Sequence, residues 1–108
     1  MMKMLGQVSD CSPKAIVVQA GAKEEINLTS VRFYNGSGGA AVVTVYVSEA
    51  DATSGVTNVV YYNAALANNA VVELTGLRLG AGQKLEVLTD VASNLIVSAF
   101  GETQSAYA

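Results

Sequence analysis

Short runs of β-branched residues, separated by turn-forming residues, constrain the fold of this chain more than any other feature of its sequence. Of its 108 residues, 16 are Val, 3 are Ile and 7 are Thr. Such side chains have restricted χ1 angles and fit the pleated surface of a sheet. No segment carries apolar residues at a sustained helical spacing. The pattern therefore predicts an all-β protein.

The apolar runs predict about seven to eight antiparallel strands in a sandwich or closed barrel, because short strands separated by turn signals are typical of these folds. The chain has no room for the helices that connect parallel strands. The predicted strands are residues 14–20, 24–35, 40–48, 56–63, 70–74, 83–89 and 95–100. The remaining segments are predicted as a connection or short helical turn at 64–69, a loop at 75–82, and a tail at 101–108 with room for one short pairing.

Two local signals refine this prediction. The Asn-Gly dipeptide at residues 35–36 is the strongest hairpin signal in the chain, and residues 37–39 (Ser-Gly-Gly) extend that loop. Within the strand at 24–35, the apolar residues change parity between Leu28 and Val31. This change predicts a β-bulge or bend near Thr29 and Ser30.

The chain length predicts one domain, since about 100–150 residues is the commonest domain size. Residues 1–13 lack periodicity and end in a turn-forming segment, so we expect an extended N-terminal arm followed by a single β-sandwich domain at 14–108. Met4 and Leu5 are the candidate contact residues of the arm, which can become ordered when it binds a partner. A frayed terminus is the alternative interpretation.

The composition excludes several classes of function. The chain has no histidine and a single cysteine, Cys11. It therefore lacks a Ser–His triad, a histidine base, an internal disulfide and a cysteine-based zinc site. Six basic residues face nine acidic ones without forming a basic cluster, so nucleic acid is not an expected partner. We also expect no cofactor. No membrane segment is expected, because polar residues interrupt the long uncharged stretch between Asp51 and Glu73.

Charged residues are scarce, at 14% of the chain, whereas about 25% is usual for soluble domains. None occurs between Asp51 and Glu73. The centre of a protein–protein interface is depleted in charge, so this stretch is a candidate contact region. An ordinary β domain with a neutral surface is the other interpretation, and composition does not decide between them.

No set of residues predicts a catalytic or metal site. The glycine-rich segment at 36–39 lacks the lysine of a phosphate loop. Both this segment and the one at 80–82 precede a predicted strand instead of a helix. Glu24 and Glu25 face opposite sides of a strand, and the Glu49–Asp51 loop lacks the further carboxylates of a calcium site. Cys11 has no basic neighbour that would activate its thiol. We therefore expect a protein that is not an enzyme.

Four further side chains are candidate interface residues. Arg32 lies between apolar residues in the middle of a predicted strand, where we expect an edge or interface charge. Tyr61 and Tyr62 are adjacent, so they project to opposite faces of a strand. One of the two faces the core, and the other is available for a protein or sugar contact. Tyr46, in the strand at 40–48, is a further candidate for such a contact.

Three segments resemble small structural proteins of tailed bacteriophages: residues 29–47 (TSVRFYNGSGGAAVVTVYV), 77–87 (LRLGAGQKLEV) and 90–102 (DVASNLIVSAFGE). The shared pattern is a strand of hydrophobic residue, Arg, aromatic residue and Asn, then a Gly/Ser loop and a Val/Thr strand. A later Leu-x-Ala-Gly-x-x-Leu segment opens another strand. The resemblance covers roughly residues 26–102 and contains no catalytic motif.

This resemblance implies a β-sandwich or jelly-roll protein of the virion. The role that fits best is a capsid decoration, or cement, protein. Such a protein binds the major capsid protein on the outside of the expanded shell, often as a homotrimer, and is made in the cytoplasm of the host bacterium. A tail or fibre-associated module that contacts protein or glycan is the alternative, and no functional residue transfers from the family.

Overall fold

The computed structural model describes residues 3–9, 11, 14–49, 59–90 and 94–105, without the side chains of 59–64. These residues form nine antiparallel strands. The strands are β1 (Lys3–Val8), β2 (Ala15–Gln19), β3 (Glu24–Asn35), β4 (Ala41–Glu49), β5 (Val59–Leu66), β6 (Val71–Leu74), β7 (Leu77–Leu79), β8 (Gln83–Thr89) and β9 (Leu95–Ser105). The predicted all-β class is confirmed.

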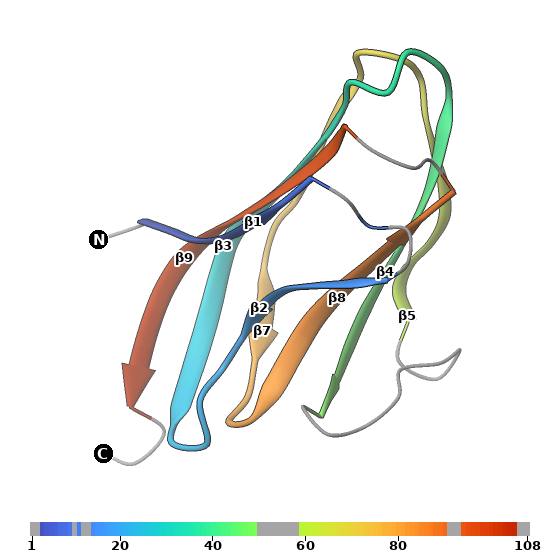
Figure 1. Cartoon of the computed structure of the whole chain (residues 1–108). Coiled ribbons are helices and arrows are strands. Elements are labelled where there is room, and N and C mark those ends of the chain that lie inside the picture. The colour runs from blue at the N-terminus through green and yellow to red at the C-terminus, as the bar shows by residue number, and fades with distance from the viewer. Residues whose placement is uncertain (1–2, 10, 12–13, 50–58, 91–93, 106–108) are drawn as a thin grey trace.

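The strands form two sheets that pack as a sandwich (Figure 1). Sheet A has the order β1-β9-β3-β6, and β7 also pairs with β3. Sheet B has the order β2-β8-β4-β5. Strands β6 and β7 pair with successive halves of β3, so together they act as one interrupted edge strand. The sandwich is therefore built from two rows of four strands.

The pairing is that of a jelly roll. β1 pairs with β9, β2 with β8, β3 with β6 and β7, and β4 with β5. The second half of the chain thus returns along the first, and the folded ribbon is rolled into two sheets. Eight strand rows with this nesting define the fold, so the sandwich with jelly-roll-like topology is confirmed.

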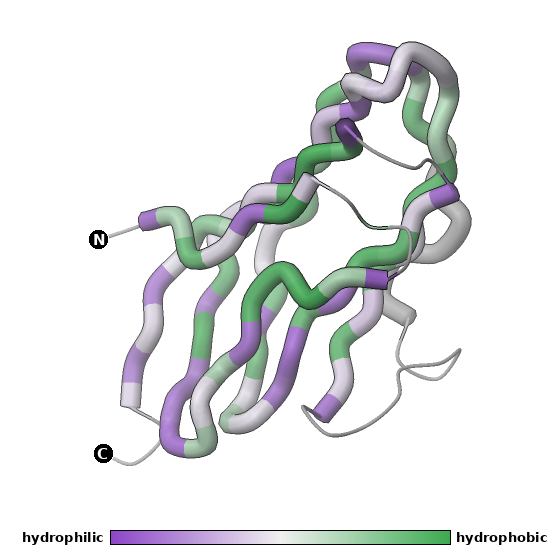
Figure 2. The backbone as a smooth tube through the Cα atoms, viewed as in Figure 1, coloured by the Kyte–Doolittle hydropathy of each residue, from purple (hydrophilic) through white to green (hydrophobic). Residues whose placement is uncertain are grey.

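Alternating side chains of both sheets fill the core between them. In β3 the alternation of buried and exposed residues shifts by one position where Ser30 and Val31 are both buried. At this point the register against β9 also shifts, between Leu28 and Ser30. The β-bulge predicted from the change in parity is confirmed. Figure 2 shows hydrophobic and hydrophilic residues alternating along β3.

The N-terminal segment differs from the expected arm. Residues Lys3–Val8 form β1, which pairs with β9 and covers what would otherwise be the open edge of that strand. Gly6 makes this placement possible, because a Cβ there would lie 2.0 Å from the Val17 carbonyl oxygen. The close approach joins the edge of sheet A to β2 of sheet B. Periodicity alone misses such a strand, because β1 is short and none of its residues is fully buried.

The hairpin prediction at Asn35-Gly36 is wrong. Strand β3 lies in sheet A and β4 lies in sheet B, so the connection crosses the sandwich instead of folding back on itself. Asn35 is fully buried, and its side chain binds backbone groups of this connection and of the one between β5 and β6. The Asn35 side chain therefore holds these two connections together, and no tight hairpin turn forms.

Three boundaries also differ from the predictions. Residues 64–66, expected in a connection, continue β5 along β4. Leu77–Leu79, expected in a loop, is β7 and pairs with Ile26–Leu28. Residues 101–105, expected in a tail, extend β9 along the first half of β3. In each case a long partner strand supplies hydrogen bonds that the local sequence does not reveal. Residues 56–58 of the strand predicted at 56–63 lie outside the described residues.

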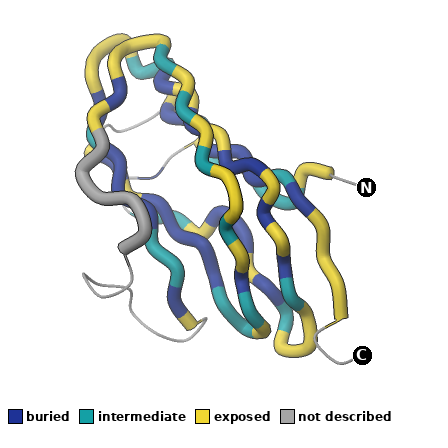
Figure 3. Tube along the Cα trace, turned by 180° about the vertical axis from the view of Figure 1, so that it is seen from behind, coloured by how far each residue is buried: buried dark blue, intermediate teal, exposed yellow. Residues whose placement is uncertain are grey.

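The connections gather at the two ends of the sandwich. Figure 1 places the β3–β4 and β5–β6 connections together at the top, and the β2–β3 and β7–β8 turns at the bottom. Figure 3 shows both ends largely exposed, while buried residues run along the strands between them. Besides these two ends, the broad outer faces of the two sheets are surfaces on which a site can form.

Candidate functional site

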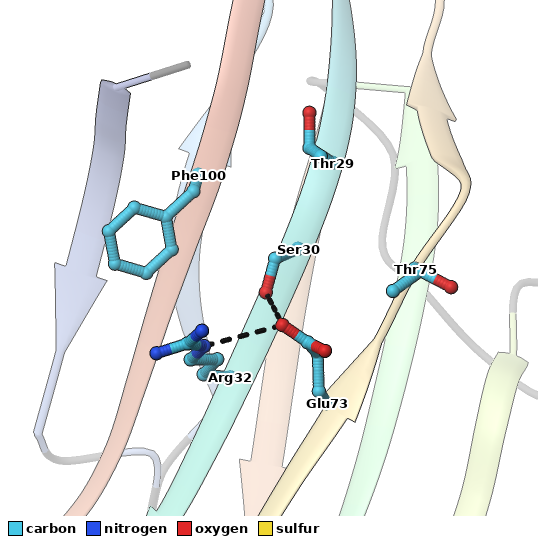
Figure 4. Close-up of a pocket in the computed structure, with 6 residues that line it drawn as sticks. All are labelled: Thr29, Ser30, Arg32, Glu73, Thr75 and Phe100. Atoms are coloured by element: carbon cyan, nitrogen blue, oxygen red, sulfur yellow. Dashed lines mark hydrogen bonds and ion pairs between the residues drawn. The ribbon is translucent and has the colours of Figure 1, made fainter.

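A shallow depression marks the outer face of sheet A. It has a volume of about 380 Å³ and lies where β3 bulges beside the gap between β6 and β7. Both irregularities interrupt the regular sheet at the same place. Bulges are often found where a protein must redirect a side chain at a functional site. The lining residues, drawn in Figure 4, are Thr29, Ser30, Arg32, Glu73, Thr75 and Phe100.

Three polar side chains are joined on the floor of the depression. The Ser30 hydroxyl donates a hydrogen bond to Glu73 Oε2, and Arg32 Nε donates to the same oxygen at 3.3 Å. The hydrogen bond from Ser30, followed by that from Arg32, lowers the pKa of Glu73 below its ordinary value. Glu73 therefore stays ionised at neutral pH and holds Arg32 in place.

The guanidinium of Arg32 also lies near the ring of Phe100. Its Cζ atom is 5.9 Å from the ring centroid, which is at the outer limit for a cation–π contact. In Figure 4 the guanidinium lies between the Phe100 ring and Glu73. The contact to Glu73 uses Nε, and the Arg32 side chain is 62% exposed.

A polar row crosses sheet A through Arg32. Gln7 of β1 pairs with Ser98 of β9, Ser98 pairs with Arg32, and Arg32 pairs with Glu73 of β6. Gln7 Nε2 donates a hydrogen bond to Ser98 Oγ at 2.9 Å. Cross-strand neighbours of this kind stabilise sheets. Arg32 therefore lies within a row of polar residues that spans β1, β9, β3 and β6.

Exposed apolar side chains lie on both sides of this polar row. Met4 is 50% exposed and pairs with Phe100 on one side. On the other side, Tyr34 is 39% exposed and pairs with Val71, which is 63% exposed. Aromatic residues, Met and Arg are enriched in protein interfaces. We call this surface the Arg32 face, defined by Met4, Arg32, Tyr34, Val71, Glu73 and Phe100.

The outer face of sheet B is different in character. Its centre carries Lys84 and Glu86, whose side chains are almost fully buried and whose charged atoms lie 3.6 Å apart. Tyr46 is half-buried on this face, with the Lys14 ammonium 4.8 Å from its ring centroid. Exposed apolar side chains also occur on this sheet, with Ile16 at 46% and Leu88 at 36% exposure. Its central charged groups, however, are covered, whereas Arg32 and Glu73 are exposed.

The structure brings together only some of the predicted interface residues. Met4 and Arg32 share the Arg32 face, on strands separated only by β9. Leu5 is half-buried and packs against the core. Tyr46 lies on sheet B, far from the other two in the sandwich. The backbones of Tyr61 and Tyr62 lie in β5, and their side chains lie outside the described residues.

Two members of this face, Glu73 and Phe100, are not predicted by the sequence. Glu73 marked only the end of an uncharged stretch, and Phe100 only the end of a predicted strand. Both contacts of Arg32 come from positions more than 40 residues away along the chain. Strand order decides such contacts, and no local pattern reports it.

Neither a metal-ligand group nor a membrane-spanning helix occurs among the described residues. They contain no group of three or more His, Cys, Asp or Glu side chains placed to hold a metal ion. Within the same ranges, no helix is long and apolar enough to cross a membrane. Cys11 is buried, and its carbonyl accepts a hydrogen bond from the Thr89 amide at 3.1 Å.

Comparison with known proteins yields distant structural neighbours. No family model and no curated protein matches the chain. A chain from the structure of infectious bursal disease virus Gx strain aligns over 99% of this chain with 13% identity and a TM-score of 0.48. A chain from the crystal structure of the T13 particle of that virus aligns over 95%, with 18% identity and a TM-score of 0.48. This chain spans 29% and 30% of theirs, so its fold assignment rests on its own strand pairing.

Proposed function

We propose that this chain is a non-enzymatic structural protein of a virion, which binds the outer surface of the expanded phage capsid and stabilises it as a cement protein. The observation that carries the proposal is the Arg32 face. It combines exposed apolar side chains with one positioned arginine, on a rigid sheet. The sequence resemblance to tailed-phage structural proteins and the jelly-roll topology, which viral capsid domains also use, support the same role.

The Arg32 face has the chemistry of a protein-docking surface. Residues that dominate binding energy in interfaces are enriched in Tyr and Arg and lie near the centre of the contact. Arg32 lies centrally, with Tyr34 and Phe100 on either side. Its charge is balanced by Glu73, so burial of the face against a partner leaves no unpaired charge. Such pairing limits the desolvation penalty of docking.

Stabilisation of the shell follows from preferential binding. A protein that binds the expanded shell better than the precursor shifts the equilibrium toward the expanded form. We propose the major capsid protein as the partner, the capsid surface as the location, and a homotrimer as the docking unit. Light scattering of the purified chain tests the last point, and a monomer at all concentrations would contradict it.

A binding experiment tests the docking role. Purified chain is mixed with expanded and unexpanded shells, and the bound fraction is measured by cosedimentation. We expect binding to expanded shells, and we expect Arg32→Ala to weaken it by about 2 kcal/mol or more, as for a central interface arginine. Arg78→Ala is the matched control, since Arg78 is also exposed on sheet A and also paired with a glutamate, Glu25.

The outcomes separate clearly. Equal loss in Arg32→Ala and Arg78→Ala would show that general charge, and not the Arg32 face, drives docking. Absence of binding to expanded shells would overturn the cement role itself.

A glycan-binding module of a tail or fibre is the second candidate, and the depression favours it. The Phe100 ring can stack on a sugar, while Arg32 and Glu73 supply a donor and an acceptor for hydroxyl groups. A glycan array with wild-type chain and Glu73→Gln tests this role. Hits that disappear in the variant would support it, and an array without hits would count against it.

A further inference from the structure

Asn35 anchors one end of the sandwich through its side chain. Its Nδ2 atom donates to three carbonyl oxygens: Gly39 O at 2.8 Å, Leu66 O at 3.0 Å and Ala67 O at 3.2 Å. Its Oδ1 atom accepts hydrogen bonds from the Ser37 amide at 3.1 Å and the Ser37 hydroxyl at 2.7 Å. The residue is fully buried. Its one side-chain amide thus forms hydrogen bonds with backbone groups of both the β3–β4 and the β5–β6 connection.

The backbone around Asn35 is held equally firmly. The Asn35 amide donates to Ala70 O at 3.0 Å, and its carbonyl accepts from the Asn69 amide at 2.7 Å. The Gly36 amide donates to Asn94 O at 2.8 Å. Asn69 and Asn94 have left-handed backbone conformations, with φ of 66° and 63°, which asparagine tolerates better than most residues. The β3–β4 connection is therefore bonded at Asn35 and Gly36 both to the β5–β6 connection and to Asn94, just before β9.

Asn-Gly is also the dipeptide most prone to spontaneous loss of ammonia, because glycine offers little steric hindrance. In that reaction the Gly36 amide nitrogen loses its proton and attacks Asn35 Cγ, forming a C–N bond as ammonia leaves with the side-chain nitrogen. Water then opens the resulting succinimide to aspartate or isoaspartate. The attack needs a free Gly36 amide and a rotatable Asn35 side chain, and the folded chain provides neither.

We propose that Asn35-Gly36 is a modification site controlled by folding. It is protected while the end of the sandwich is closed and is converted when that end opens. The conversion is chemically irreversible. The new carboxylate would face the Gly39, Leu66 and Ala67 carbonyl oxygens that Nδ2 now binds. The oxygen that replaces Nδ2 would face these acceptors, while Ser37 would donate only to the oxygen that corresponds to Oδ1. Burial of such a partly compensated charge is unfavourable, so a converted chain closes this end less stably at neutral pH.

Prolonged opening of this end therefore leaves a chemical trace in the chain. Chains that unfold, or that wait too long before folding, become permanently marked at residue 35. Folded chains keep the amide. The proposal does not depend on which partner the Arg32 face binds, so it stands or falls separately from the cement role.

The first experiment measures conversion in the wild-type chain. Folded protein and protein unfolded in urea are incubated at mildly alkaline pH, and the peptide containing Asn35 is followed by mass spectrometry and an isoaspartate assay. We expect conversion to be slower in the folded chain by about tenfold or more, because the end must open first. Equal rates in the two states, or no conversion in urea, would overturn the proposal.

The second experiment uses Asn35→Asp as the product of conversion, with Asn68→Asp as the matched control. Asn68 lies at the same end, and its Oδ1 atom accepts from the Gly38 amide at 3.1 Å, a bond that aspartate retains. We expect Asn35→Asp to lower the urea midpoint strongly at neutral pH and less at acid pH, where the carboxyl carries a proton that it can donate. An Asn35→Asp midpoint equal to that of Asn68→Asp would overturn the proposal.

Discussion

Gly101 lies in β9 where the bulged part of β3 passes closest to it. A Cβ at this position would lie 2.0 Å from the Asn27 carbonyl oxygen and 3.0 Å from two further backbone atoms. Backbone atoms of a paired strand cannot move aside as a flexible side chain can. The bulge that shapes the depression therefore requires glycine on the neighbouring strand.

We predict that Gly101→Ala lowers the free energy of unfolding by about 1–3 kcal/mol, the usual range for overpacking. Urea denaturation checks this value. Gly39→Ala is the control, because nothing lies within 4 Å of the Cβ it would add. A Gly101→Ala midpoint equal to that of Gly39→Ala would contradict the close approach.

Glu73 contributes to stability in a pH-dependent way. Its pKa in the folded chain is lowered by Ser30 and Arg32, so the unfolded chain binds the proton at higher pH than the folded one. Its contribution is present above its unfolded value of about 4.3 and is lost as pH falls through the lower folded value. We predict that stability falls less on acidification in Glu73→Gln than in wild type, measured by urea midpoints between about pH 6 and pH 3. Parallel curves for the two proteins would contradict this.

At the scale of elements, β1 closes the sandwich. It pairs with β9 on one side, and it approaches β2 through Gly6 and Val17 on the other. An uncovered β9 would present a row of unpaired backbone groups, which invites pairing with other chains. The segment that the sequence presents as an arm is thus the strand that protects the edge of sheet A.

We predict that Gly6→Ala loosens β1 from the sandwich, because the new Cβ would meet the Val17 carbonyl oxygen at 2.0 Å. Hydrogen exchange of the amides in β1 and of those in β9 that bond to it should accelerate selectively, while β4 and β8 keep their protection. Unchanged exchange in β1 would contradict the predicted contact. Uniform acceleration across both sheets would show that β1 is not an independent unit.

At the scale of the whole molecule, nesting of the strands separates pairing partners widely along the chain. The outermost pair joins residues 3–8 to residues 97–101, and the next joins 15–19 to 84–87. Among the described strands, only β4 and β5 are consecutive in sequence and also paired in one sheet. Long-range pairing requires costly loop closure before contacts form.

We predict that the chain refolds slowly for its size, on a timescale of about milliseconds to seconds. Stopped-flow dilution from urea, followed by tyrosine fluorescence, measures this rate. Refolding in microseconds would contradict a mechanism limited by distant strand pairing. A conversion-blocked variant is not needed here, because the measurement ends long before Asn35 can react.

Local patterns determined the class of this protein. Alternating β-branched residues predicted strands close to β2, β3, β4, β8 and the first half of β9, and the parity change between Leu28 and Val31 predicted the bulge. These features depend on residues that are neighbours along the chain, so the sequence displays them directly. The shortage of charge and the lack of histidine likewise follow from composition alone.

The tertiary structure alone decided which strands became neighbours, and with them every contact of functional interest. Arg32 meets Glu73 and Phe100, Gly6 meets Val17, and Asn35 binds carbonyl groups more than 30 residues away. A strand's sequence specifies which side chains face inward, but it specifies its partner strand only weakly. The composition therefore predicted a neutral β domain, and the rolled topology placed one arginine at the centre of its exposed face and one asparagine at the junction of its loops.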